Sequence, residues 1–152
     1  MAGLGFVAQS SVFTTDTVKK AVLQIVAAAN HRVLVDEISI SFTGTSASGT
    51  PILVEVERHT SAGSGGDALT LVKQSPGDDE TLQTSALENI DDSGGLPTLG
   101  DYIMGEHVHP QFGFLWQAPQ GKPIIVPGGT RLGISVTAAA AVNCNARIKG
   151  EE

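Results

Sequence analysis

The chain of 152 residues is poor in cysteine and in basic residues, and each shortage excludes a class of protein. Its single cysteine, Cys144, permits neither an intrachain disulfide nor a thiolate-rich zinc site. Nine lysines and arginines stand against sixteen acidic residues, which gives a net charge of −7. The chain therefore lacks the basic stripe that binds phosphates or an anionic membrane surface, and we expect neither nucleic acid nor a membrane as a partner.

Long hydrophobic runs are also missing. The longest apolar run is AVLQIVAAA, residues 21–29, about half the length that spans a bilayer. The opening MAGLGFVAQSSVF lacks the basic start and sustained apolar region of a signal peptide, so we expect synthesis in the cytoplasm. Only 16% of the residues are charged, which suits a chain that hides part of its surface in an assembly.

The dominant positive signal is alternation with a period of two, the pattern of half-buried strands. Four segments show it clearly, at 38–42, 51–59, 131–138 and 142–150. Their apolar, inward-facing positions are Ile38, Ile40 and Phe42; Ile52, Val54 and Val56; Leu132, Ile134 and Val136; and Val142, Cys144, Ala146 and Ile148. Turns rich in glycine and small polar residues separate them, which predicts an all-β fold, a single jelly-roll-like β-sandwich or barrel.

Three regions are less clearly patterned. Alanines in residues 15–31 permit a helix, but the β-branched and other core-type residues there favour a strand. Residues 75–101 contain seven acidic residues and no basic ones, and they predict a long solvated acidic loop with a helical turn near Thr84–Asn89. Residues 1–17 predict a short flexible or docking N-terminal arm, which leaves residues 18–152 as a single β-sandwich domain.

The stretch GEHVHPQFGFLW, residues 105–116, is the strongest candidate for chemistry. His107 and His109 are two apart, so on a strand both imidazoles point to one face and can reach one metal ion. The metal-binding cupin pattern adds a glutamate a few residues later and a histidine on a later strand. Here no carboxylate follows until Glu151, and no histidine follows at all. The sequence therefore predicts no metal site, no other cofactor and no enzyme.

Aromatic residues follow the histidines at Phe112, Phe114 and Trp116, again two apart and so on one face of a strand. The simpler interpretation is that they fill the core of the sandwich. The alternative is that part of this strand is exposed as an association surface, where large aromatic side chains act as anchors.

Read from end to end, the chain resembles the head decoration, or cement, proteins of tailed bacteriophages. The resemblance depends on VLQIVAAANHRVLVDEISISFTGTSASGTPILVEV, on EHVHPQFGFLW and on PGGTRLGISVTAAAAVNCNARIKGEE, which together span most of residues 18–150. It is a likeness of overall pattern and includes no catalytic motif.

This resemblance implies a jelly-roll-like sandwich that assembles as a homotrimer on the outer surface of the virion capsid. Such trimers bind at three-fold and quasi-three-fold positions and stabilise the lattice of the major capsid protein. The family supplies no invariant contact motif, so the candidate subunit or capsid contacts come from this sequence alone. They are Leu4, Phe6, Val7 and Phe13 in the expected arm, and His107, His109 and Trp116 in the later strand.

Two other classes of function remain open. One is another phage structural β-protein, such as a head fibre, a tail or baseplate component, or a receptor-binding module. A receptor module that binds sugars needs exposed aromatic residues, and this chain has one tryptophan and one tyrosine. The other, less favoured, is a cupin-like metalloenzyme.

Overall fold

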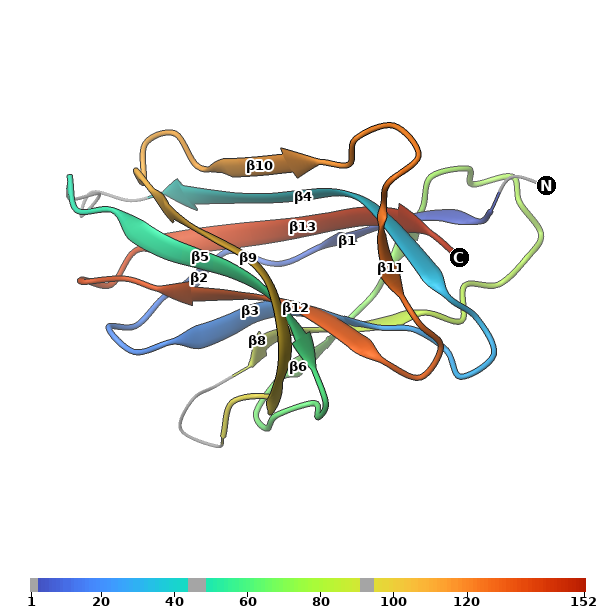
Figure 1. Ribbon diagram of the computed structural model, residues 1–152, viewed down its shortest axis with the longest axis horizontal. Helices are drawn as coiled ribbons and strands as arrows, with labels where there is room; N and C mark the ends of the chain where they lie inside the picture. The colour runs from blue at the N-terminus through green and yellow to red at the C-terminus, as the bar shows by residue number, and fades with distance from the viewer. Residues whose placement is uncertain (1–2, 44–48, 91–94) are drawn as a thin grey trace.

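The computed structural model describes residues 3–43, 49–90 and 95–152, which form two antiparallel sheets packed as a β-sandwich (Figure 1). The expectation of an all-β sandwich is confirmed. The described residues form strands, turns and bends with no helical element. Among them, accordingly, no helix has the length and hydrophobicity needed to cross a membrane.

The first sheet, sheet A, runs in the order β10-β4-β13-β1-β7, with β11 also paired to β4 and β2 to β13. Figure 1 shows β10, β4, β13 and β1 side by side, with both chain termini at one end of the molecule. The strands of sheet A are β1 (Gly5–Gln9), β2 (Phe13–Thr14), β4 (Val33–Thr43), β7 (Val72–Lys73), β10 (Phe114–Gln117), β11 (Ile124–Val126) and β13 (Asn143–Glu151).

The second sheet, sheet B, runs in the order β6-β8-β3-β12-β5-β9, so β6 and β9 are its edges. Its strand β3 confirms that residues 15–31 contain a strand. The strands of sheet B are β3 (Lys20–Val26), β5 (Ile52–His59), β6 (Asp67–Leu69), β8 (Ser85–Ile90), β9 (Leu99–Val108) and β12 (Arg131–Thr137).

The four clearest predicted strands form the middle of the two sheets, where β4 pairs with β13 and β5 pairs with β12. Every inward position predicted for them is buried except Phe42, which is half-buried and packs against the core. Burying one such aliphatic side chain stabilises the fold by about 1.5–3 kcal/mol. The Cys144 thiol is part of this core, and burial raises its pKa to about 12.

The predicted N-terminal arm is wrong for the part of it that the structure describes, residues 3–17. β1 lies inside sheet A, between β13 and β7, and Phe6 is fully buried. Backbone hydrogen bonds join the two chain ends, from Leu4 N to Glu152 O at 2.9 Å and from Glu152 N to Leu4 O at 3.1 Å. The sequence pattern does not reveal this strand, because β1 is short and its main partner, β13, is far from it in the sequence.

The predicted acidic loop is shorter than expected, and the helical turn within it is wrong. Residues 85–90 form strand β8, and β9 begins at Leu99; residues 91–94 lie outside the described residues. Glu88 in β8 is buried and accepts hydrogen bonds from Ser11 N at 2.6 Å and Ser11 Oγ at 2.9 Å. An acidic residue expected in a solvated loop therefore holds two distant segments together.

Candidate functional site

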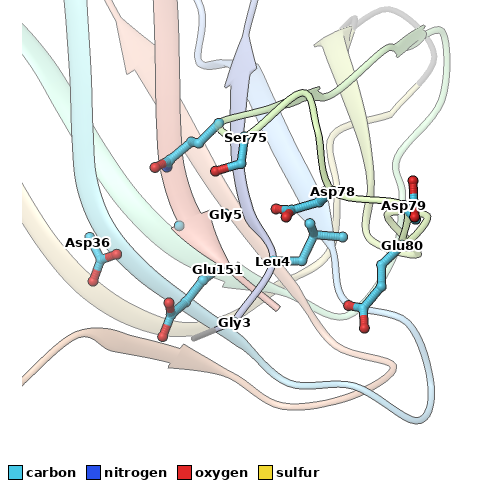
Figure 2. Close-up of a pocket in the computed structure, with 11 residues that line it drawn as sticks. Gly3, Leu4, Gly5, Asp36, Ser75, Asp78, Asp79, Glu80 and Glu151 are labelled. Carbon is cyan, nitrogen blue, oxygen red and sulfur yellow. The ribbon is translucent and has the colours of Figure 1, made fainter. Parts of the chain in front are cut away.

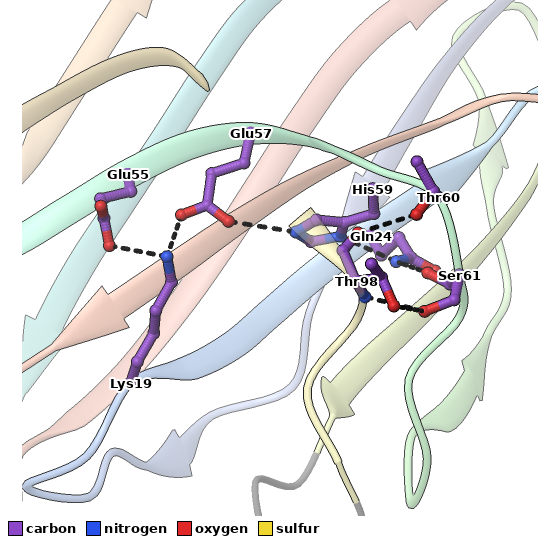
Figure 3. A network of polar contacts seen from close by, with 8 residues as sticks. All are labelled: Lys19, Gln24, Glu55, Glu57, His59, Thr60, Ser61 and Thr98. Atoms are coloured by element: carbon purple, nitrogen blue, oxygen red, sulfur yellow. Dashed lines mark hydrogen bonds and ion pairs between the residues drawn. The ribbon is translucent and has the colours of Figure 1, made fainter. Parts of the chain in front are cut away.

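The outward face of sheet B, which points away from the core, carries polar side chains that are buried. Gln24, Glu57, His59 and Ser135 are each at most 4% exposed. Gln24 and Glu57 lie close together because each pairs with Gly133 of β12, one from either side. Burying a charge in this way is costly unless it is paired and hydrogen-bonded. Figure 3 shows Gln24, Glu57 and His59 linked in one continuous polar network.

The charged end of the network joins Lys19 to two glutamates of β5. Lys19 Nζ forms an ion pair with Glu57 and a second one with Glu55 Oε2, at 3.0 Å. The far oxygen of Glu57, Oε2, lies 3.4 Å from Nε2 of His59. Glu57 is therefore held on both sides, by a cation and by an imidazole.

The other end of the network fixes the tautomer of His59. Gln24 Nε2 donates to His59 Nδ1 at 2.8 Å and to Ser61 O at 3.1 Å, while Gln24 Oε1 accepts a hydrogen bond from Arg131 Nη1 at 3.3 Å. Because Nδ1 accepts, the ring proton of the neutral imidazole belongs on Nε2, which donates to Glu57. Both ring nitrogens are thus engaged.

The pKa values follow from this arrangement. Burial raises the pKa of Glu57, but the hydrogen bonds from His59 and Lys19 and the charge of Lys19 outweigh it and hold that pKa below its usual value. Burial lowers the pKa of Lys19, and its hydrogen bonds to Glu57 and Glu55, with their charges, raise it above its usual value. Glu57 and Lys19 are therefore both charged across the neutral pH range.

Gly133 makes room for the His59 ring. A Cβ atom placed on Gly133 would lie 2.1 Å from Cε1 and 2.5 Å from Nδ1 of His59. Real Cβ atoms do not approach ring atoms so closely, so the imidazole lies across β12 only because this position has no side chain.

A loop closes over the network. The loop of residues 60–66 runs beside residues 95–98, where Thr98 N donates to Ser61 Oγ at 2.8 Å. The carbonyl of Ser61 receives the hydrogen bond from Gln24, so the loop is tied directly to the network. With both imidazole nitrogens hydrogen-bonded and the carboxylate paired with a lysine, this arrangement ties β3, β5 and the loop together.

Sequence reasoning missed this network. The alternation in residues 51–59 predicts a half-buried strand with one phase facing solvent, whereas Glu57 and His59 on that phase are buried. One signal was present: Glu55, Glu57 and His59 share one phase of a strand, and Gln24 interrupts the apolar run of β3. Nothing local to these segments indicates that a loop covers them.

The two histidines of residues 105–116 lie in different local structures, His107 in a strand and His109 in a turn. His107 is exposed on β9, opposite Leu53. His109 belongs to the turn after β9, where its Nδ1 accepts a hydrogen bond from Gln111 N at 3.2 Å. Among the residues that the structure describes, no group of three histidine, cysteine, aspartate or glutamate side chains is placed to hold a metal ion.

The three aromatic residues of this stretch differ in burial. Phe114 and Trp116 pair with Ile40 and Ile38 of β4 and pack, half-buried, against the core. Phe112 lies in the turn before β10 and is 86% exposed. The core-filling interpretation is confirmed for two of the three and is wrong for Phe112.

The candidate contacts in the expected arm also differ in burial. Leu4 and Phe6 are buried within the chain, so neither is available to a neighbour while the sandwich is intact. Val7 is half-buried in β1, and Phe13 is half-buried against the core with Lys20 Nζ 5.3 Å from its ring centroid. Of the seven predicted contacts, His107 is the most clearly exposed.

Acidic side chains gather around a cavity of about 450 Å³ near the chain termini. Figure 2 shows these carboxylates spread around the cavity and pointing in different directions, without converging on one point. Its acidic lining residues are Asp36, Asp78, Asp79, Glu80 and Glu151.

Most of the exposed large apolar side chains lie in one part of the sequence, residues 96–125. β9 is a ten-residue edge strand that pairs with β5 and, within the described residues, with no strand on its other side. It exposes Leu99 and Tyr102 by 51% and 53%. Six of the nine large hydrophobic side chains exposed in the described part of the chain fall between residues 96 and 125: Leu96, Leu99, Tyr102, Phe112, Leu115 and Ile125.

Comparisons with known proteins add no relative to this description. No protein-family model matches the chain, and neither a curated protein nor a solved structure matches it significantly. The candidate sites therefore rest on the residues of this chain alone.

Proposed function

We propose that the chain is a structural virion protein, a phage head decoration protein that binds the outer surface of an expanded capsid as a homotrimer. In this proposal it has a jelly-roll-like sandwich and stabilises the lattice of the major capsid protein from three-fold and quasi-three-fold positions. The single observation that supports an assembly function is the exposed edge strand β9.

β9 has the properties of an association edge. Edge strands present unpaired N–H and C=O groups, and proteins protect them with short length, charged side chains (lysine above all), proline or bulges; β9 carries two charged residues, Asp101 and Glu106. β9 has ten residues and contains no lysine or proline, although its register with β5 shifts at two places. Leu99 and Tyr102 add apolar area along the same strand. Pairing this edge with a neighbouring chain satisfies the free backbone groups and buries these side chains.

A trimer places a geometric demand on this contact. Two copies of β9 that pair with each other produce a two-fold dimer, because each chain uses the same surface. A closed ring of three needs β9 to meet a different surface of the next copy. Three capsid-binding surfaces on one trimer then reinforce each other without a strong contact in any one of them, and the capsid is stabilised by the free energy of binding.

The test begins with the association state of the purified chain. Sedimentation equilibrium is expected to give a trimer for the wild type and a smaller species for Leu99→Lys, because a charge within the contact is costly to bury. Val72→Lys is the matched control, since Val72 is 63% exposed on β7, an edge of the other sheet, and its variant should remain trimeric.

The second half of the test uses expanded, undecorated capsids of the same phage. The wild type and Val72→Lys are expected to bind saturably, with about one trimer for each three-fold position, and to raise the capsid melting temperature. A wild-type chain that stays monomeric at high concentration and does not bind the capsids would contradict the proposal.

A further inference from the structure

A groove of about 400 Å³ lies on the outward face of sheet A, beside the exposed Phe112 ring. It is built from four neighbouring strands of the sheet, β10, β4, β13 and β1, and from Phe112 in the turn before β10. Its polar lining is Gln9 from β1, Ser39 and Ser41 from β4, and Asn145 and Arg147 from β13. The assembly function proposed above makes no use of this groove.

The Phe112 ring is held in place although it is exposed. Phe112 N and Gly113 N both donate to the carbonyl of His109, at 3.0 and 3.3 Å, and the His109 ring meets the Phe112 ring edge-on at 5.6 Å. Gly113 has φ +67°, and a Cβ there would lie 2.7 Å from Ile40 O. The turn therefore requires glycine, and it presents an aromatic ring to solvent in a defined position.

The floor of the groove offers unused hydrogen-bonding groups. Ser41 Oγ donates to Asn145 Oδ1 at 2.5 Å, which leaves the amide nitrogen of Asn145 free as a donor. Gln9 Nε2 is turned toward Ala146 O at 3.4 Å, which leaves Gln9 Oε1 as an acceptor. Ser39 contributes a hydroxyl group to the lining. The lining thus offers both donors and acceptors.

The charge in the groove is largely neutralised. Arg147 Nη2 donates to Glu37 Oε1 at 2.5 Å, so the guanidinium is already paired with a carboxylate. The other polar lining residues are uncharged. A strongly anionic ligand such as a phosphate finds no unpaired cation here, and the net charge of −7 also opposes its approach.

We propose that this groove binds a neutral carbohydrate. A pyranose ring has one apolar face of C–H groups, which matches an exposed aromatic ring, and hydroxyl groups that both donate and accept. Phe112 packs against the C–H face, while Asn145, Gln9 and Ser39 bind the hydroxyls. The volume falls at the lower end of the range for small-molecule sites, which suits one or two sugar rings. The sequence showed too few tryptophan and tyrosine residues for such a site, because it did not reveal that a phenylalanine is exposed.

Saturation-transfer NMR on the full chain tests this site. The probes are neutral disaccharides (maltose, cellobiose, lactose and chitobiose), followed by oligosaccharides released from bacterial surface polysaccharide. Transfer to the ring C–H protons of at least one probe is expected, together with shifts of the side-chain amide signals of Asn145 and Gln9 in a ¹⁵N spectrum.

Phe112→Ala should weaken the Kd at least tenfold, and Val72→Ala is the control, an exposed apolar residue outside the groove and outside β9 whose truncation should leave binding unchanged. Because Phe112 is 86% exposed, its variant should keep the wild-type melting temperature, so lost binding does not mean lost folding. The proposal is overturned if no neutral sugar binds, if Phe112→Ala binds as the wild type does, or if only sulfated sugars bind and salt abolishes that binding.

Discussion

The two outward faces of the sandwich have the same alternating sequence pattern and opposite physical character. On sheet A the outward positions of β4 and β13 include serines and asparagines that are half-buried or exposed, such as Ser41 and Asn145. On sheet B the corresponding positions of β5 include Glu57 and His59, which are buried beneath a loop and a lysine. Strand periodicity identifies which side chains share a face, but it does not reveal whether another part of the chain covers that face.

The difference has an energetic consequence. A charge that remains near water interacts weakly with its partner, because solvent screens it. A charge that is removed from water depends on its partner, and deleting one member of a buried pair leaves the other uncompensated. Each face contains a glutamate in an ion pair, Glu37 on sheet A and Glu57 on sheet B, so the comparison can be tested directly.

The largest expected effect is the loss of stability in Glu57→Gln. The Glu57 side chain is 3% exposed, and the amide cannot neutralise Lys19 or accept the His59 hydrogen bond as strongly. We expect the free energy of unfolding, measured by urea denaturation at pH 7, to fall by about 3 kcal/mol. Glu37→Gln, the same change on the other face, should cost less than about 1 kcal/mol, because Arg147 opposite it is 42% exposed. Equal losses in the two variants would remove the distinction between the faces.

A smaller loss of folding stability is expected for Gly133→Ala. The added methyl group collides with the His59 ring and must displace it from Glu57 and Gln24, which we expect to cost about 1–3 kcal/mol by urea denaturation. Gly77→Ala is the control, because a Cβ there has no neighbour within 4 Å. It should change stability by less than about 0.5 kcal/mol. A Gly133→Ala protein as stable as Gly77→Ala would mean that the His59 ring is not confined as described.

The smallest expected effect is a change in how stability depends on pH. The folded-state pKa of Glu57 lies below its ordinary 4.5, so its contribution is present above pH 4.5 and is lost as pH falls through the lower, folded value. A pKa lowered by one unit corresponds to about 1.4 kcal/mol. The pKa of Lys19 is raised above 10.5, so its contribution is lost only as pH rises beyond that value.

Urea denaturation of the wild type and of Glu57→Gln between pH 3 and 7 measures this dependence. The wild type should lose stability more steeply below about pH 4.5 than the variant does. Parallel curves would show that Glu57 is not held in its ionised form by the fold.

The sequence predicted the sandwich and the centre of both sheets because β4, β5, β12 and β13 are long and alternate clearly. It did not predict β1 or β8, because a short strand is recognised by its partner, and the main partner of β1 lies at the opposite end of the chain. The same limit applies to the sites. His109 and Phe112 were singled out by residue type, but the turn that positions them depends on the contact of Gly113 with Ile40.

The place of β13 in sheet A determines when the protein can fold during its synthesis. β13 lies between β4 and β1 and also pairs with β2, yet every other strand of the sheet precedes it in the sequence. Until residues 143–151 emerge, β1 and β4 have no strand between them, and the inner face of sheet B has an incomplete layer to pack against. Such long-range pairing makes folding slow and leaves apolar strands exposed beforehand. The nascent chain therefore cannot complete sheet A until residues 143–151 have been synthesised, and a ribosome that stalls before residue 143 releases a product without a complete sandwich.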